Sequence, residues 1–144
     1  MIKFPTKETN IICQGITGTT GGAHTERAIA YGSHIVGGVS RDKGVKKFLD
    51  LPVFPTVKEA VRKTKPDISV VFSNPNRVYA DVEEAVKARV PMVICTTTSV
   101  PYHDALKMRE LAQQYKVCVL GPSSPGIVVP EQVLAGNMPA HLFP

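Results

Sequence analysis

The chain has 144 residues, which is the size of one domain with a substantial hydrophobic core. Hydrophobic residues make up 43% of the chain and charged residues 20%, as in an ordinary soluble globular protein. No apolar run approaches the length of a membrane span, and the N-terminus lacks the apolar centre of a signal peptide. The net charge of +5 favours anionic ligands, but the lysines and arginines are scattered, so we expect neither a membrane nor a nucleic-acid partner.

The three cysteines indicate a reducing compartment. Cys13, Cys95 and Cys118 each fall within a predicted strand or at its end, and none forms a C-x-x-C pair. This spacing suggests neither a metal site nor a disulfide framework. Buried free thiols are typical of a reducing environment, so we expect a cytoplasmic protein.

Short apolar segments alternate with helical segments along most of the chain. The predicted strands are 10–13, 33–39, 52–54, 68–72, 90–95 and 117–120. The predicted helices are 24–32, 57–63, 78–88 and 102–114. The helix at 57–63 is expected from the capping-box pattern of Thr56 and Glu59. Beyond residue 126 the periodicity fades, so 127–144 is expected to be a loose C-terminal tail or linker.

This alternation predicts an α/β fold with a parallel, doubly wound sheet in a three-layer α/β/α domain over residues 1–126. The segment 68–72 is apolar on both faces, which suits a sheet covered on both sides. In such sheets the ligand lies beyond the carboxyl ends of the strands. This geometry brings together five loops, namely 14–22, 40–44, 72–76, 96–99 and 121–126.

The loop after the first strand is rich in glycine and leads into a helix. Gly15, Gly18, Gly21 and Gly22 would let the backbone approach a ligand without a Cβ in the way. Free N–H groups and the dipole at a helix N-terminus attract anions. The pattern therefore predicts either a phosphate cradle or an ordinary tight turn.

The end of the second strand bears on which nucleotide would bind. An NAD site usually places Asp or Glu there, to hold a ribose hydroxyl. This chain has Val39, Ser40 and Arg41, with Lys43 just after, while Asp42 lies beyond the strand end between two cations. A cationic loop suits a phosphate on the ribose, as in NADP or coenzyme A. The alternative is that Arg41 and Lys43 are solvated loop charges.

No catalytic arrangement emerges from the sequence. His24 is placed near the glycine loop, whereas His34, His103 and His141 lack a paired carboxylate. No helix carries a His-x-x-x-His pair for zinc, and no Ser-His-Asp arrangement can be inferred. We therefore expect a domain that holds a nucleotide, with no catalytic and no metal-binding residues of its own.

Motifs spread over nearly the whole chain match those of one family. They comprise 12–18 with Gly21 and His24, 28–32, 36–39, 43–44, 51–54, 56–57, 59–60, 121–122, 125–126, 138–139 and His141. On these motifs the chain resembles the N-terminal CoA-binding domain of the succinate–CoA ligase (succinyl-CoA synthetase) alpha subunit, an ADP- or GDP-forming enzyme of the tricarboxylic acid cycle.

This resemblance implies a Rossmann-like domain that binds coenzyme A, with Gly15 in the glycine loop. It places the phosphates on the loop and one lysine, namely Thr17, Gly18, Thr19, Thr20 and Lys43. It places the adenosine among Val39, Arg41, Phe72 and Ser73. The pantetheine would run along Thr96, Thr97 and Thr98.

The chain departs from the family pattern at three places. The family usually has Thr-Glu at 97–98, Asn-Cys at 123–124 and a proline-rich turn at 74–76. These changes leave CoA binding in place and open the alternative of a relative acting on another acid.

The family also implies a second domain. Family alpha subunits are about twice this length, and their phosphorylated histidine lies in that domain, so 127–144 would lead towards it. The expected partners are this domain and an ATP-grasp beta subunit, and the isolated chain is expected to be inactive. The alternatives are a stand-alone CoA-binding or regulatory module and an NADP-dependent oxidoreductase fragment.

Overall fold

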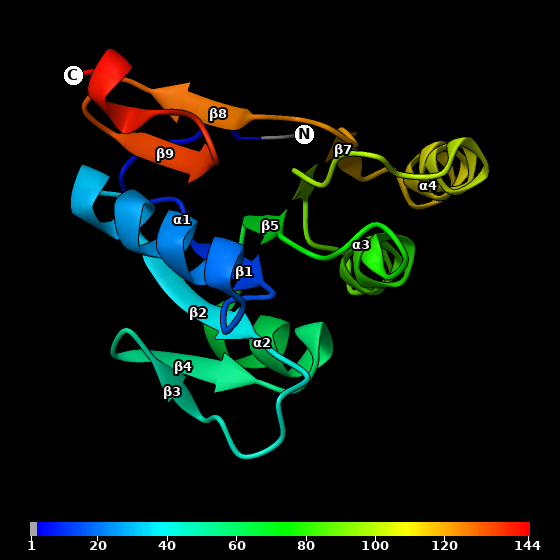
Figure 1. Ribbon diagram of the computed structural model, residues 1–144, viewed down its shortest axis with the longest axis horizontal. Helices are drawn as coiled ribbons and strands as arrows, with labels where there is room; N and C mark the ends of the chain where they lie inside the picture. The colour runs from blue at the N-terminus through cyan, green and yellow to red at the C-terminus, as the bar shows by residue number, and fades with distance from the viewer. Residues whose placement is uncertain (1–2) are drawn as a thin grey trace.

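A seven-stranded, mostly parallel sheet forms the centre of the protein in a computed structural model that describes residues 3–144 (Figure 1). Its strands lie in the order β3-β4-β2-β1-β5-β6-β7. Only the pair β3 and β4, at one edge, is antiparallel. The strands are β1 Ile11–Gln14, β2 Ile35–Val39, β3 Lys47–Phe48, β4 Leu51–Phe54, β5 Ile68–Val71, β6 Met92–Cys95 and β7 Cys118–Leu120.

Both faces of the sheet are covered, which makes three layers (Figure 1). One face carries α2 Val57–Thr64, α3 Val78–Lys87 and α4 Tyr102–Tyr115. The other carries α1 Thr19–Tyr31 and an antiparallel hairpin of β8 Gly126–Val129 and β9 Val133–Gly136. A short 3-10 helix, Ala140–Leu142, follows. The predicted doubly wound α/β fold is therefore confirmed.

Alternation along each strand builds two hydrophobic cores. Successive side chains of a strand point to opposite faces of the sheet. Ile12 and Val71 pack with the core beneath α2, α3 and α4, whereas Ile11 and Val70 pack with the core beneath α1 and the hairpin. All four side chains are at most 1% exposed, as expected for strands that are apolar on both faces.

Helix α1 starts earlier than its sequence suggests. It begins at Thr19 and not at residue 24, so Gly21 and Gly22 lie within its first turns. Glycine is unfavourable in helix interiors, so the sequence analysis assigned Gly21 and Gly22 to the loop and began the helix after them. Both residues are buried, Gly21 against the carbonyl of Gly15 and Gly22 against the ring of Phe48, and this close packing leaves little room for a Cβ.

The expectation of a loose tail after residue 126 was wrong for the segment 126–136. Strands β5, β6 and β7 present apolar side chains on the same face as α1, in the part of that face that α1 does not reach. The hairpin covers them through Val129, Val133 and Ala135, which are all nearly inaccessible. Tertiary burial thus orders a segment without strong local periodicity. The role of 127–144 as a linker stays a prediction.

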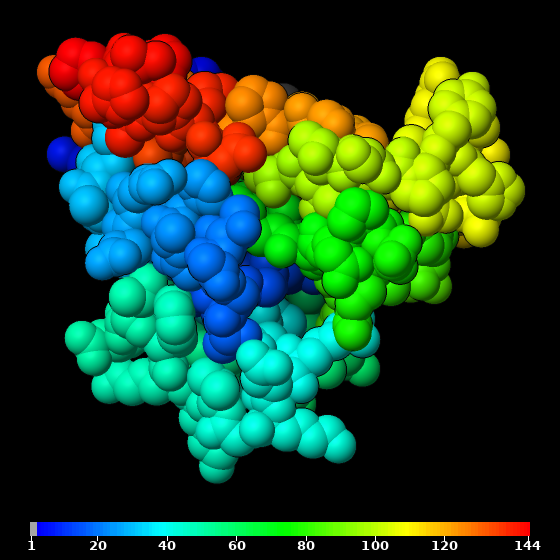
Figure 2. All heavy atoms as spheres, viewed as in Figure 1, coloured from blue at the N-terminus to red at the C-terminus, as the bar shows by residue number. Residues whose placement is uncertain are grey.

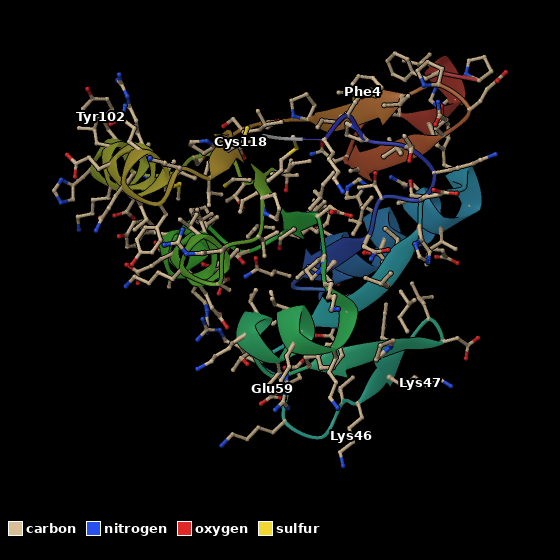
Figure 3. All side chains as sticks on the ribbon, turned by 180° about the vertical axis from the view of Figure 1, so that it is seen from behind. Phe4, Lys46, Lys47, Glu59, Tyr102 and Cys118 are labelled. Carbon is tan, nitrogen blue, oxygen red and sulfur yellow. The ribbon has the colours of Figure 1, made fainter. Side chains whose placement is uncertain are left out.

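One local prediction, the N-cap of α2, has a clear outcome. The hydroxyl of Thr56 accepts a hydrogen bond from the amide of Glu59 at 3.2 Å, so the predicted N-cap of α2 is confirmed. At the outer end of α4, Tyr102 projects away from the molecule (Figure 3). Within residues 3–144, none of the helices has the length and apolar character needed to cross a membrane.

Candidate functional site: the carboxyl ends of β1, β2, β5 and β6

The sheet has a topological switch point beside β1. This strand pairs with β2 on one side and with β5 on the other, so the connections after β1 and β5 diverge. Ligands of open α/β sheets bind in the crevice that opens at such a point. Figure 2 shows the surface hollowed between the blue start of α1 and the green residues of α3.

Two adjoining cavities occupy this edge of the sheet. The first has a volume of about 220 Å³ and lies between the ends of β1, β2 and β5 and the start of α3. The second has a volume of about 470 Å³ and continues along the start of α1 towards the end of β6. The residues that line both are Gly18, Phe72, Ser73 and Asn74. One elongated ligand can therefore follow the two cavities across the start of α1.

The glycine loop has the backbone geometry of an anion site. Gly15 has a φ of +80°, and its amide donates a hydrogen bond to the carbonyl of Val39 at 2.9 Å. Gly18 is the N-cap of α1 with a φ of −73°, so the left-handed backbone lies at Gly15. No side chain caps α1 and its first turn holds no acid, which leaves its N–H groups available to an anion.

Arg41 is not simply a solvated charge. Its Nη2 atom lies 2.8 Å from Oδ1 of Asp81, a residue of α3 whose side chain is only 12% exposed. The hydroxyl of Ser73 donates a short hydrogen bond to the other carboxylate oxygen. The sequence analysis missed Asp81; the available signal was an acidic residue beside Val78 and Val82 on the apolar face of α3.

A second polar cluster joins the glycine loop to the segment after β2. The hydroxyl of Thr17 donates to Oδ2 of Asp42 at 2.7 Å and lies 2.6 Å from the hydroxyl of Ser40. The hydroxyl of Ser40 also accepts the amide hydrogen of Asp42 at 3.1 Å. These bonds fix the backbone that carries Arg41. They also bring a carboxylate into the first cavity, where the sequence analysis expected only cations.

The remaining cations of this loop lie further out. Lys43 is exposed and is not among the residues that line either cavity. Lys46 and Lys47 project outward from the molecule (Figure 3). Lys47 lies 3.8 Å from Asp50 in an exposed pair. Of the cations in this region, Arg41 lines the first cavity, whereas Lys43, Lys46 and Lys47 are surface charges.

The predicted threonines line the second cavity, and two of them hold the loop in place. The hydroxyl of Thr96 donates to the carbonyl of Val71 at 2.8 Å, and that of Thr97 donates to the carbonyl of Ser73 at 2.6 Å. Thr98 is exposed at the cavity edge. Asn137, which follows β9, also lines this cavity. The sequence analysis missed it because the tail carried no regular pattern.

Val39, Thr19 and Thr20 complete the set of predicted site residues. Val39 is buried at the end of β2 and lines the first cavity. Thr19 and Thr20 line the second cavity from the first turn of α1. Lys43 is thus the one predicted residue outside both linings, because Arg41 and Asp42 precede it and face the crevice.

The titratable groups near the site do not form a catalytic pair. The ring of His24 stacks on Phe72 with centroids 5.6 Å apart and an interplanar angle of 12°. Partial burial, and then the charge of Arg27, lower the pKa of His24 below its ordinary value. Burial raises the pKa of Cys13 and of Cys95 to about 11, so both thiols stay protonated at neutral pH. Within residues 3–144, no cluster of His, Cys, Asp and Glu could hold a metal ion.

Comparison with known proteins identifies the family. The CoA binding domain family matches residues 6–99, a range that contains all four loops lining the two cavities apart from Asn137. The chain belongs to the CoA-binding domain family. The ligand of this family is coenzyme A, an elongated molecule that carries phosphates near one end.

The curated relatives of this CoA-binding domain are ligase subunits. It is 41% identical over 138 residues to the succinate–CoA ligase [ADP-forming] subunit alpha 2 of Archaeoglobus fulgidus, covering 95% of this chain and 48% of the relative. It is 37% identical over 141 residues to the malate–CoA ligase subunit alpha of Methylorubrum extorquens, again covering 95% and 48%. The domain is therefore homologous to succinate–CoA ligase alpha subunits, and it spans about half the length of these relatives.

Solved structures share the fold of this CoA-binding domain. The ATP citrate lyase of Methanothrix soehngenii, solved with citrate and coenzyme A, superposes with a TM-score of 0.81 at 18% identity, over 94% of this chain and 24% of that one. An NAD binding oxidoreductase from Klebsiella pneumoniae superposes with a TM-score of 0.62 at 18% identity, over 78% and 34%. Both likenesses concern the fold alone.

Proposed function

We propose that this chain is the CoA-binding half of a succinate–CoA ligase-like alpha subunit, and that CoA lies along the two adjoining cavities. The observation that carries this proposal is the position of Gly18. This residue lines both cavities and is the uncapped N-terminus of α1. An elongated ligand with a diphosphate between two larger parts matches that arrangement.

The binding mode assigns each part of CoA to residues that are already positioned. The adenosine occupies the first cavity, between Val39 and Arg41 on one side and Phe72 and Ser73 on the other. The diphosphate lies on the backbone from Thr17 to Thr20, with Lys43 reaching in from its exposed loop. The pantetheine follows the second cavity along 96–98.

The chemistry available at this site is binding and orientation. His24 contacts Phe72 and Arg27, and its lowered pKa keeps the imidazole neutral near pH 7. The contacts of His24 with Phe72 and Arg27 supply no carboxylate that would activate the ring as a nucleophile. We therefore assign the activation of the acid, with ATP or GTP, to a further ligase domain and an ATP-grasp beta subunit. This assignment rests on the names and lengths of the relatives. We also propose that the protein is cytoplasmic.

Calorimetric titration of the purified chain tests the binding proposal. CoA is expected to bind most tightly, dephospho-CoA more weakly, and NADPH and NADH weakest of all. The match to the CoA binding domain family supports CoA over the nicotinamide dinucleotides, and Arg41 in the first cavity supports CoA over dephospho-CoA. Absence of CoA binding by a folded chain would overturn the proposal.

A dinucleotide-binding fragment is the second candidate, and Asp42 is the observation that favours it. Its carboxylate lies at the mouth of the first cavity, after β2, where dinucleotide-binding folds hold a ribose hydroxyl. The same titration separates the two candidates, because this function requires NADH or NADPH to bind more tightly than CoA. A neighbouring gene that encodes an ATP-grasp subunit would favour the ligase alpha subunit over a stand-alone CoA-binding module.

A further inference from the structure

An ion pair joins the two walls of the first cavity. Arg41 belongs to the segment after β2, and Asp81 belongs to the first turn of α3. Their 2.8 Å contact therefore spans the space in which the proposed function places the adenosine. The side chain of Arg41 is 55% exposed, whereas that of Asp81 is 12% exposed. The arginine is the partner that can leave without opening the core.

Asp81 keeps other stabilising contacts when Arg41 leaves. The hydroxyl of Ser73 donates to one of its carboxylate oxygens. The N-terminal end of α3 also stabilises a negative charge in its first turn. Asp81 therefore keeps two favourable contacts without the arginine. A partly exposed ion pair of this kind contributes little to stability, so a stronger anion can displace it.

The charges around the cavity show why this pair matters for a phosphate. The carboxylates that line it are Asp42, Asp81 and Glu84, and the cations are Arg41 and Arg77. Asp42 is fixed by the hydroxyl of Thr17. A phosphate on the ribose therefore gains the guanidinium of Arg41 only by taking it from Asp81.

We propose that Asp81 competes with the ligand for Arg41 and so lowers the affinity for a ribose that carries a phosphate. Arg41 pairs with Asp81 in the empty cavity and moves to the 3′-phosphate of CoA on binding. The carboxylate thereby sets the discrimination between CoA and dephospho-CoA. This inference rests on the proposed CoA-binding function and adds the residue that tunes its affinity.

Calorimetric titration of the folded chain with CoA and with dephospho-CoA tests this competition. Asp81→Asn keeps the size of the side chain and its contact with Ser73 but removes the charge. CoA should bind this variant about tenfold more tightly, while the affinity for dephospho-CoA changes by less than about twofold. Arg41→Gln should weaken CoA binding about tenfold more than it weakens dephospho-CoA binding. In the double variant the gain from Asp81→Asn should vanish, because no arginine is left to release.

A matched control separates competition from general repulsion. Glu84→Gln removes a carboxylate that lines the same cavity but accepts the amide hydrogen of Val57 instead. An equal gain in CoA affinity from Glu84→Gln and from Asp81→Asn would overturn the proposal. So would an Asp81→Asn variant that melts like the wild type and binds CoA no more tightly. If dephospho-CoA still binds in either case, the proposed function stands, whereas loss of both ligands from the wild type refutes that function itself.

Discussion

Gly21, in the first turn of α1, packs directly against the carbonyl oxygen of Gly15, with no room for a Cβ between them. This contact fixes the start of α1 against the left-handed turn of the glycine loop. The backbone that the proposed diphosphate would meet is therefore set by two residues without side chains.

Replacement of Gly21 tests that packing. Gly21→Ala forces a methyl group into the Gly15 carbonyl, and overpacking of this kind costs about 1–3 kcal/mol. Urea denaturation should show that loss in the free energy of unfolding. Gly18→Ala is the matched control, because its φ is negative and its Cβ would lie 3.3 Å from the same oxygen. Equal stability of the two variants would contradict the packing argument.

Replacement of Gly18 tests the phosphate cradle. Gly18→Val places two methyl groups at the N-terminus of α1, and the backbone there is extended, a conformation open to valine. We expect native circular dichroism and a loss of CoA affinity of at least about tenfold, or 1.4 kcal/mol. The CoA affinity of Gly18→Ala should lie between that of Gly18→Val and that of the wild type. Wild-type CoA affinity in a folded Gly18→Val chain would show that the loop is an ordinary turn.

Lys43 is predicted to contact the CoA phosphates from an exposed loop. Lys43→Ala should weaken CoA binding about tenfold, since one charge-assisted contact contributes about 1.5–3 kcal/mol and exposure reduces it. The wild-type affinity should also fall with added salt. Lys47→Ala is the control, because that exposed lysine of β3 pairs with Asp50 in the turn that follows. If the two variants bind CoA alike, Lys43 has no special role.

The hairpin is expected to be an integral part of the domain. The buried hydroxyl of Ser33 donates to the carbonyl of Leu134 at 2.8 Å and accepts from its amide at 2.7 Å. Ser33→Ala leaves both backbone groups unpaired, which costs about 1–3 kcal/mol of unfolding free energy. Ser123→Ala, at an exposed position, serves as the control in urea denaturation. An unchanged Ser33→Ala variant would favour a separable tail and a domain boundary near residue 126.

The chain by itself should form no thioester. Incubation with CoA, succinate, magnesium and ATP or GTP is expected to yield neither succinyl-CoA nor a phosphoprotein. A phosphorylated histidine needs an adjacent group that activates it. The contacts of His24 are with Phe72 and Arg27, and neither provides a carboxylate. A complete alpha and beta subunit pair provides the positive control. Phosphate retained on His24 or His141 would make the 144-residue chain an enzyme in its own right.

The sequence alone predicted six of the seven strands of the sheet, all except β3, and most of the cavity lining. Local patterns identify β1, β2, β5 and β6, because each is a short apolar run bounded by turn residues. Parallel strands bring their carboxyl ends to one edge, so the loops at 14–22, 40–44, 72–76 and 96–99 had to meet. That inference needs only the strand that precedes each loop in the sequence, and no knowledge of contacts between distant residues.

Tertiary structure decided the features that depend on distant partners. Positions 21 and 22 of α1 hold glycine because a Cβ would meet the carbonyl of Gly15 at the first position and the ring of Phe48 at the second. Residues 126–136 become a hairpin because an apolar sheet face needs a cover, which no pattern within the segment announces. The pairing of Arg41 with Asp81 joins residues from two different elements, so its charge balance exists only in the folded protein. Sequence determines local periodicity and loop chemistry, whereas burial and long-range electrostatics arise only when the segments are brought together.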